Sequence, residues 1–234
     1  MPIQILIETE SLLIVDKPHG WLTTPARLVY DPRPCLGRSL QKQVDAQIYP
    51  VHRLDFEVSG LTVWAKTPVA HRLAQEWFEH ARVRKLYEAL TEKSGIPDAV
   101  NNIQDSGWME WTCKLERGKK RAFIADHGKA SKTLARRTGE GSRGGAGDIR
   151  PAGGHPKLTR WELVPVTGRP HQLRFEMSRH GCPIFGDVLY GGAPVADPGW
   201  IALRAVELDL RGVADRLGLP EVVCVEGLTL PGQS

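Results

Sequence analysis

The sequence predicts an α+β fold, because the expected strands and helices are interleaved without a regular βαβ repeat. Two periodicities carry this prediction. Apolar and polar residues alternate over residues 61–65, which is typical of a strand, whereas apolar residues recur every four positions after Thr67, which is typical of a helix. No glycine-rich nucleotide fingerprint is present, which argues against a doubly wound α/β fold.

Short apolar runs predict the strands of the first half. Residues 11–18 predict a buried strand that ends at Pro18, with Gly20 in the turn that follows. Residues 61–65 predict a strand with one face toward the core, and residues 85–90 predict a further strand.

A helix is expected to follow the strand at residues 61–65. Thr67 suits its N-cap, and Pro68 suits its first helical position. Its apolar stripe is expected to consist of Val69, Leu73, Trp77 and Ala81. Upstream, residues 27–38 are expected to form a loop.

The second half begins with a polar segment before regular structure resumes. Residues 138–155 are rich in glycine and are expected to form a flexible basic loop. A strand is expected over residues 158–164. The turn at residues 167–170 then leads into a short helix over residues 171–180, which Gly181 closes at the left-handed cap position.

Length and composition limit the class of protein. The 234 residues are 41% hydrophobic and 25% charged, which excludes disorder and fibrous repeats and suits one large domain or two small ones. No stretch approaches the ~18 apolar residues of a membrane span, and the N-terminal apolar run meets Glu8 too early for a signal peptide. We therefore expect a cytoplasmic protein with no membrane partner. The four cysteines are far apart, which argues against a disulfide scaffold or a structural zinc.

Positive charge is concentrated in one segment. The chain has a net charge of +4, but residues 114–160 hold 13 basic and 4 acidic residues, a local net charge of +9. Such a segment attracts polyanions, which makes nucleic acid a candidate partner. The alternative, a solvated lysine-rich loop, stays open on charge alone.

An expected turn just before the strand at residues 61–65 contains His52, Arg53 and Asp55. An acid on a loop that a rigid strand supports is a common catalytic arrangement, because the sheet fixes its position and the loop leaves it accessible. The alternative is that Asp55 caps the turn and pairs with Arg53.

A second polar group lies at the expected helix start. The run TGRPHQLR over residues 167–174 places Arg169, His171 and Arg174 where free N–H groups and the helix dipole favour anions. This group could hold phosphate, or Arg174 could face a carboxylate. The alternative is an ordinary helix start with solvated arginines.

Several short motifs occur in a fixed order along the chain. They are residues 13–20 (LIVDKPHG), 51–55 (VHRLD), 59–61 (SGL), 65–66 (AK), 85–89 (KLYEA), 128–133 (GKASKT), 167–174, 183–184, 186–187 and 190–191, together with Gly181. This ordered combination resembles the RluA-type pseudouridine synthases over most of the chain. Two departures from the family pattern are Val58, where threonine is usual, and Arg204, where histidine is frequent. Neither departure changes Asp55.

The resemblance implies a fold and an activity. The fold would be the pseudouridine synthase catalytic fold, with a central mixed, mainly antiparallel sheet flanked by helices and loops. We expect a single domain over residues 1–234 without an S4 domain, and with a basic, glycine-rich insertion around residues 114–160. The activity would be isomerisation of specific uridines in tRNA or rRNA, by a monomer that needs no metal or organic cofactor.

The resemblance also implies catalytic roles. Asp55 would be the essential carboxylate, either as a nucleophile towards the sugar or base or as a base that removes a ribose proton. Arg174 would keep Asp55 ionised by its opposite charge. Tyr87 would lie against the uracil ring, although an ordinary strand tyrosine is the alternative.

A uracil within an RNA stem must be extruded before a carboxylate can reach it, at a cost of a few kcal/mol. Arg53 would fill the vacated space while His52 supports the turn. Arg169 and His171 would hold neighbouring phosphates. Leu203 is expected to contact the substrate, and for both histidines a purely structural role stays open.

Two rival functions compete with this hypothesis. A metal-dependent nuclease or phosphoesterase would use His52, Asp55 and His171 as ligands, but Arg53 lies between the first two and no further carboxylate cluster completes a two-metal site. A non-catalytic RNA-binding module would use the same scaffold and bind RNA through its basic segment.

Overall fold

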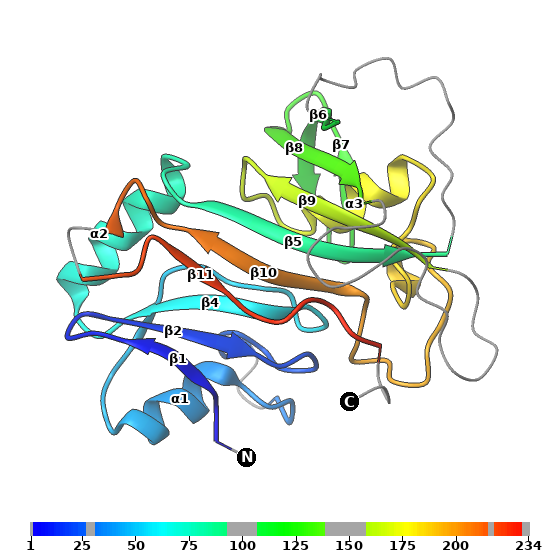
Figure 1. Cartoon of the computed structure of the whole chain (residues 1–234). Coiled ribbons are helices and arrows are strands. Elements are labelled where there is room, and N and C mark those ends of the chain that lie inside the picture. Colours follow the sequence, from blue (N-terminus) through cyan, green and yellow to red (C-terminus); the bar gives the residue numbers. More distant parts are fainter. Residues whose placement is uncertain (1, 27–30, 93–106, 139–157, 215–217, 231–234) are drawn as a thin grey trace. The chain divides into compact units, whose positions relative to one another are not determined.

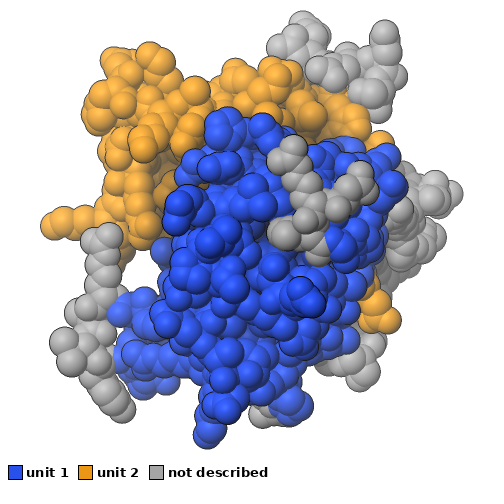
Figure 2. All heavy atoms as spheres, turned by 90° about the vertical axis from the view of Figure 1, so that its left-hand side faces the viewer, with its two compact units in different colours: residues 1–85, 205–225 blue, residues 86–204, 226–234 orange. Residues whose placement is uncertain are grey.

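The computed structural model describes residues 2–26, 31–92, 107–138, 158–214 and 218–230. The loop predicted over residues 138–155 therefore lies almost wholly outside the described residues. Among the residues that are described, no helix has the length and apolarity needed to cross a membrane. Two compact units, shown in different colours in Figure 2, comprise Met1–Lys85 with Ala205–Val225, and Leu86–Arg204 with Glu226–Ser234.

The first unit contains a sheet with the strand order β1-β2-β4-β10 (Figure 1). In addition, β3 pairs with β4, and β11 pairs with β10. The strand predicted over residues 11–18 is confirmed as β2, which ends directly before Pro18. The first two residues of β10 belong to the second unit. The strands are β1 Ile5–Glu8, β2 Leu12–Lys17, β3 Tyr49–Pro50, β4 Ser59–Ala65, β10 Leu203–Asp209 and β11 Val222–Cys224.

Strand β4 is buried along its whole length, so the prediction that only one of its faces points to the core is wrong. Leu61, Val63 and Ala65 pack in an apolar cluster with helix α2 (Pro68–Glu79). Trp64 packs in a second cluster with helix α1 (Leu36–Val44). A strand with a helix over each face has no solvent-facing side. The polar side chain of Thr62 is buried there, and its Oγ accepts a hydrogen bond from the Trp64 indole N–H at 3.1 Å.

Helix α2 begins where the sequence predicts. The Oγ of Thr67 accepts a hydrogen bond from the Ala70 N–H at 3.1 Å, and Pro68 occupies the first position. The predicted apolar stripe is wrong at both ends, because Val69 is 73% exposed and Ala81 is exposed beyond the helix. A strict four-residue spacing rotates around a helix of 3.6 residues per turn. The stripe that is buried consists of Ala70, Ala74 and Trp77.

The loop predicted over residues 27–38 extends too far, because its last three residues belong to helix α1. Leu36 and Leu40 are buried against the sheet of the first unit. The N-cap residue, Cys35, makes no side-chain capping hydrogen bond, so the sequence carries none of the usual signals of a helix start.

The second unit contains strands in the order β5-β9-β8-β6-β7, and every pairing in this order is antiparallel (Figure 1). The strands predicted over residues 85–90 and 158–164 are confirmed as β5 and β9. The first two residues of β5 belong to the first unit. The strands are β5 Arg84–Thr91, β6 Met109–Arg117, β7 Ala122–Ile124, β8 Lys129–Arg137 and β9 Thr159–Pro165.

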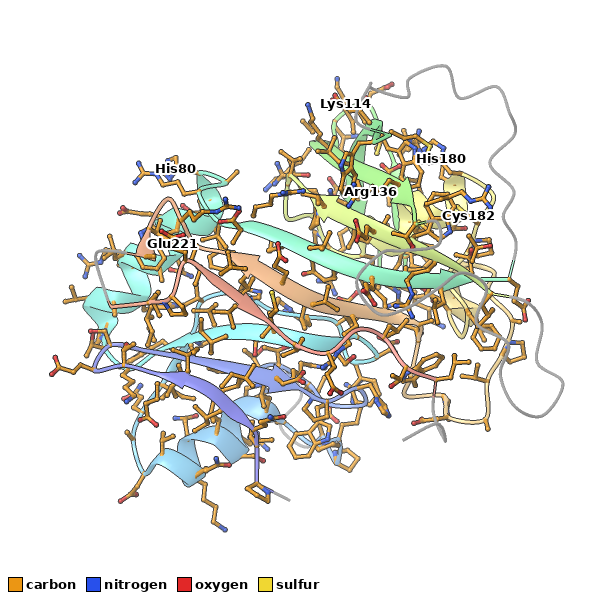
Figure 3. All side chains as sticks on the ribbon, viewed as in Figure 1. His80, Lys114, Arg136, His180, Cys182 and Glu221 are labelled. Atoms are coloured by element: carbon orange, nitrogen blue, oxygen red, sulfur yellow. The ribbon has the colours of Figure 1, made fainter. Side chains whose placement is uncertain are left out.

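Much of the segment expected to be a basic insertion therefore forms regular strands. In β6, Met109, Trp111 and Leu115 are buried, whereas Thr112 and Lys114 are exposed. Because the charged residues lie on the outward face, a run that is basic in sequence still contributes an apolar inner face. Figure 3 labels two of these basic side chains, Lys114 on β6 and Arg136 on β8.

The predicted short helix is confirmed as α3, which spans Gln172–Arg179. Gly181 follows with φ +74°, in the left-handed conformation that the sequence predicts. A short 3-10 helix, η1, spans Val188–Tyr190.

Candidate active site

His52, Arg53 and Asp55 lie in the turn between β3 and β4 in the first unit. Arg53 is exposed, whereas His52 and Asp55 are half-buried. The Asp55 carbonyl accepts a hydrogen bond from the Val58 N–H at 3.2 Å, which closes the turn. The structure thus presents a carboxyl group on a short closed turn directly before a buried strand, where it could act as a nucleophile or a base.

Thr23 holds the turn on the N-terminal side of Asp55. Its Oγ donates a hydrogen bond to the Leu54 carbonyl at 2.8 Å, and the Leu54 N–H donates to the same Oγ at 3.1 Å. Thr23 is buried, so water does not compete strongly for these bonds. Sequence reasoning missed Thr23, because its partner is 31 residues away and no local pattern marks the pair.

Lys17 holds the turn on the C-terminal side of Asp55. Its Nζ donates to the carbonyl oxygens of Val58 at 2.7 Å, Phe56 at 3.3 Å and Pro18 at 3.0 Å. Burial lowers the pKa of Lys17 from 10.5 to about 7, in spite of the attraction of nearby carboxylates, Asp55 first among them. Sequence reasoning included Lys17 only in the expected strand over residues 11–18 and assigned it no role.

His52 serves as a neutral hydrogen-bond acceptor in the first unit. Its Nε2 accepts a hydrogen bond from the Val63 N–H at 3.2 Å, and its ring stacks on Phe78 with centroids 4.5 Å apart. Burial and then the positive charge of Lys85 lower the pKa of His52 from 6.5 to about 3. These contacts join the turn to β4 and α2, so a structural role for His52 is observed and its contact with RNA stays a prediction.

Arg174 lies on α3 in the second unit and is buried together with Asp187. Its Nε donates to one carboxylate oxygen of Asp187 at 2.7 Å, and its Nη2 donates to the other at 2.8 Å. The guanidinium also lies over the Tyr190 ring, 5.5 Å from the centroid. A bidentate pair fixes the orientation of Arg174, so the alternative of a solvated arginine at a helix start is wrong.

The turn before α3 is held by Gln172. Its carbonyl oxygen accepts hydrogen bonds from the Arg169 N–H at 3.0 Å and the Thr167 hydroxyl at 2.7 Å. Its amide donates to the Lys132 carbonyl and the Thr133 hydroxyl, both at 2.9 Å. This network joins the turn to β8, and sequence reasoning missed it.

The two remaining residues predicted to hold phosphate, Arg169 and His171, are both half-buried. The Nε of Arg169 donates to the Ala130 carbonyl at 2.9 Å. His171 is half-buried, has φ +54°, and places its Nδ1 3.1 Å from the Tyr190 hydroxyl oxygen. The structure brings Arg169, His171 and Arg174 together at the start of one helix, with Arg174 buried and the other two half-buried.

Tyr87 and Leu203 are both buried in the second unit. Tyr87 lies on β5 opposite Leu163 of β9 and is 8% exposed. Leu203 is the first residue of β10 and is 3% exposed. Within the part of the chain that the structure describes, no group of three or more His, Cys, Asp or Glu side chains is arranged to hold a metal.

Comparisons with known proteins add an independent finding. A family model described as RNA pseudouridylate synthase matches residues 11–179. The dual-specificity RNA pseudouridine synthase RluA of Vibrio vulnificus (strain CMCP6) is 33% identical over 80% of this chain and 68% of its own length. The tRNA pseudouridine synthase C of Salmonella typhi is 29% identical over 81% of this chain and 70% of its own length.

Solved structures show the same fold. Human RNA Pseudouridylate Synthase Domain Containing 1 aligns with a TM-score of 0.65 at 23% identity, over 97% of this chain and 83% of that chain. Human RNA Pseudouridylate Synthase Domain Containing 4 aligns with a TM-score of 0.64 at 20% identity, over 95% of this chain and 88% of that chain. At these identities the likeness establishes the α+β pseudouridine synthase fold that the sequence predicts.

Proposed function

The chain belongs to the RNA pseudouridylate synthase family and is thus an RNA-modifying isomerase, and from this premise we propose that Asp55 is the essential carboxylate of the reaction. The substrates are uridines in transfer or ribosomal RNA, the two classes that the sequence resemblance implies. The names of the relatives refer to RNA and to tRNA, which supports this choice.

The placement of Asp55 is the observation that carries the proposal. Its turn is held by buried hydrogen bonds from Thr23 on one side and Lys17 on the other, while Asp55 itself stays half-buried. A catalytic group needs this combination, since a displacement of about 1 Å can cost ~100-fold in rate. Isomerisation breaks the N-glycosidic bond, turns the uracil and joins its carbon to the same ribose, so it needs no co-substrate.

Arg174 and Tyr87 complete the proposed catalytic set. The sequence resemblance implies that Arg174 keeps the catalytic carboxylate ionised, and the ion pair with Asp187 fixes the orientation of its guanidinium. Tyr87 supplies a ring for the uracil. Both residues lie on regular elements, and Arg174 is further held by its ion pair, which suits a preorganised site.

RNA binding is assigned to basic residues in the turn of Asp55 and at the start of α3. Arg53 is exposed at the turn of Asp55, which suits a residue that replaces an extruded nucleotide in its stack. Arg169 and His171 are proposed to contact phosphates, and Leu203 to contact the base. Base flipping, the monomeric state and a cytoplasmic location stay predictions.

Mapping of pseudouridine tests the proposed function. Total RNA from cells with and without the gene is compared site by site, and we expect at least one uridine that is modified only when the gene is present. The purified protein should then modify a transcript of that RNA, and chelation of metals should not change the rate. Binding of RNA without any new pseudouridine would favour the non-catalytic module, and loss of activity on chelation would favour the metal-dependent rival.

A further inference from the structure

Arg33 forms a bidentate ion pair with Asp31 in the segment before α1. Its Nε donates to one carboxylate oxygen of Asp31 at 2.9 Å, and its Nη2 donates to the other at 2.6 Å. The backbone N–H of Arg33 donates to the first of these oxygens at 3.0 Å. These hydrogen bonds lower the pKa of Asp31 from 3.8 to about 2, so the pair stays charged, and they fix the plane of the guanidinium.

The ring of Phe56 covers one side of this guanidinium. The Cζ of Arg33 lies 5.1 Å from the ring centroid, a distance at which the face of the ring attracts a cation. Phe56 is half-buried and directly follows Asp55, so the Cα atoms of these two residues are about 3.8 Å apart. The side chain of Arg33 is 45% exposed and that of Asp31 only 10%, so the pair presents its guanidinium to solvent beside the proposed catalytic turn.

The segment that carries Arg33 is stiff. Pro32 and Pro34 flank Arg33, and the ring of each proline restricts the backbone. The Pro34 carbonyl accepts a hydrogen bond from the Leu22 N–H at 2.8 Å, and Leu22 forms a β-bridge with Cys35. Because Arg33 is already held in one orientation, a ligand that contacts it loses little affinity to the ordering of the side chain.

The charge of the pair determines which part of an RNA it can contact. A solvated arginine attracts phosphate, but the carboxylate of Asp31 offsets the charge of Arg33 and repels an anion. A nucleobase carries no charge, and unstacked bases stack on guanidinium planes in RNA recognition. A base on the exposed side of Arg33 would complete a stack that consists of the Phe56 ring, the guanidinium and the base.

We propose that Arg33 is a specificity-determining residue, whose guanidinium stacks on the base of a nucleotide next to the target uridine. This inference rests on the proposed function, because Asp55 marks the position of that uridine. Phe56 supports the guanidinium on its other side, and Asp31 sets its orientation. The reaction should therefore depend on the presence of a base at a neighbouring position as well as on the target uridine.

A second pair with the same spacing provides the matched control. Arg211 donates to the two carboxylate oxygens of Asp209 from its Nε at 3.0 Å and its Nη2 at 2.6 Å, and its side chain is 63% exposed. This pair lies at the end of β10 in the same unit. The charges that act on Arg33 include that of Glu57 in the Asp55 turn, whereas those that act on Arg211 come from β10 and from the residue before β11.

The test compares RNA substrates that lack one base. The RNA identified by pseudouridine mapping is prepared intact, with an abasic site directly 5′ of the target uridine, or with an abasic site directly 3′ of it. The measured quantity is the ratio of kcat/KM on intact RNA to kcat/KM on abasic RNA, in which the fraction of active protein cancels. For wild-type protein we expect a ratio of about 5 or more at one of the two positions, since stacking of one base contributes at least this much.

Arg33→Lys keeps the positive charge but removes the planar group that a base can stack on. The ratio for this variant should fall below about 2 at the position where the wild-type ratio is high, because no stack is left to lose. Arg211→Lys should keep the wild-type ratio. A contact with phosphate would instead leave the ratio for Arg33→Lys unchanged, because lysine retains the charge.

The outcomes distinguish this proposal from the proposed function. If the wild-type ratio is close to 1 at both positions, or if Arg33→Lys keeps a high wild-type ratio, the role of Arg33 is refuted and the function stands. Loss of the ratio in Arg211→Lys as well would also refute it. If wild-type protein forms no pseudouridine on intact RNA, the function itself fails. If Arg33→Lys does not fold by circular dichroism, Arg33→Gln decides by the same criterion.

Discussion

At the residue scale, sequence motifs identify Asp55 but not the two side chains that hold its turn in place, Thr23 and Lys17. Asp55 can be identified from the sequence, because an acid follows a histidine and an arginine before a strand. Thr23 and Lys17 cannot be found in this way, because the carbonyl groups of the turn that they contact are 31 to 41 residues away. The sequence indicates Arg174 as a candidate but not its partner Asp187, since the pair forms only when α3 and the segment before η1 come together.

His52 makes the stability of the first unit sensitive to acid. Its pKa is about 3 in the folded protein and ordinarily 6.5, so between these values the unfolded chain binds a proton that the folded chain does not. Stability is therefore lost as the pH falls from 6.5 through 3, by on the order of 2–4 kcal/mol for this group. Urea unfolding at pH 7 and at pH 4 measures the effect.

His52→Gln should lose less stability than wild-type protein between these two pH values, although it is less stable at pH 7. The control is His127→Gln, because His127 is exposed on the turn between β7 and β8. Equal pH dependence in wild-type protein and His52→Gln would contradict the assignment of His52 as a half-buried neutral acceptor.

At the element scale, local signals predict some boundaries well and some faces badly. Thr67 and Pro68 mark the start of α2, because a cap and a proline act within one turn of helix. The number of buried faces of β4 depends on both α1 and α2, so no window of sequence could show it. Strand β6 escapes prediction because charged residues on its outward face conceal the apolar alternation within a basic run. Strand β8 escapes prediction because its buried residues are the small side chains of Ser131, Thr133 and Ala135.

Close packing between β4 and β10 requires glycine at position 60. Gly60 has φ +110°, and a Cβ there would lie 2.1 Å from the carbonyl oxygen of Ala205. Gly60→Ala should lower the free energy of unfolding by about 3 kcal/mol or more, because backbone strain and a backbone clash combine. Chemical denaturation of the purified variant measures this loss.

The matched control is Gly218→Ala in the same unit. Gly218 also has a positive φ, +62°, but an added Cβ would meet nothing within 4 Å. This variant should lose only about 1 kcal/mol, since strain acts without a clash. Similar losses in the two variants would mean that β4 and β10 do not approach closely at Gly60.

At the scale of the whole molecule, charge is distributed unevenly along the chain. The net charge is +4, while residues 114–160 carry +9. Some of this charge is neutralised within the second unit, where Lys132 pairs with Glu110 at 2.9 Å and Arg136 pairs with Glu162 at 2.6 Å. The connection between β6 and β7 instead exposes Lys119, Lys120 and Arg121. These three residues are therefore the ones expected to bind RNA phosphates.

Charge reversal of Lys119, Lys120 and Arg121 to glutamate should weaken RNA binding and reduce its dependence on salt. The slope of log K against log salt should decrease by about 0.7–0.9 for each phosphate that the variant no longer neutralises. Filter binding between roughly 50 and 200 mM salt gives both quantities. The control is the double variant Arg38→Glu with Lys42→Glu, because these exposed basic residues of α1 lie outside residues 114–160. If this double variant and the triple variant weaken RNA binding equally, a specific role of the β6–β7 connection is refuted.

The most direct measurement concerns the carboxylate of Asp55. Asp55→Asn replaces one oxygen by an amide nitrogen and preserves the shape of the side chain, so RNA binding and folding should remain close to the wild-type values. Pseudouridine in the mapped RNA should then fall below detection in single-turnover reactions. Formation of pseudouridine by Asp55→Asn at the wild-type rate would contradict the assignment of Asp55 as the group that performs the chemistry.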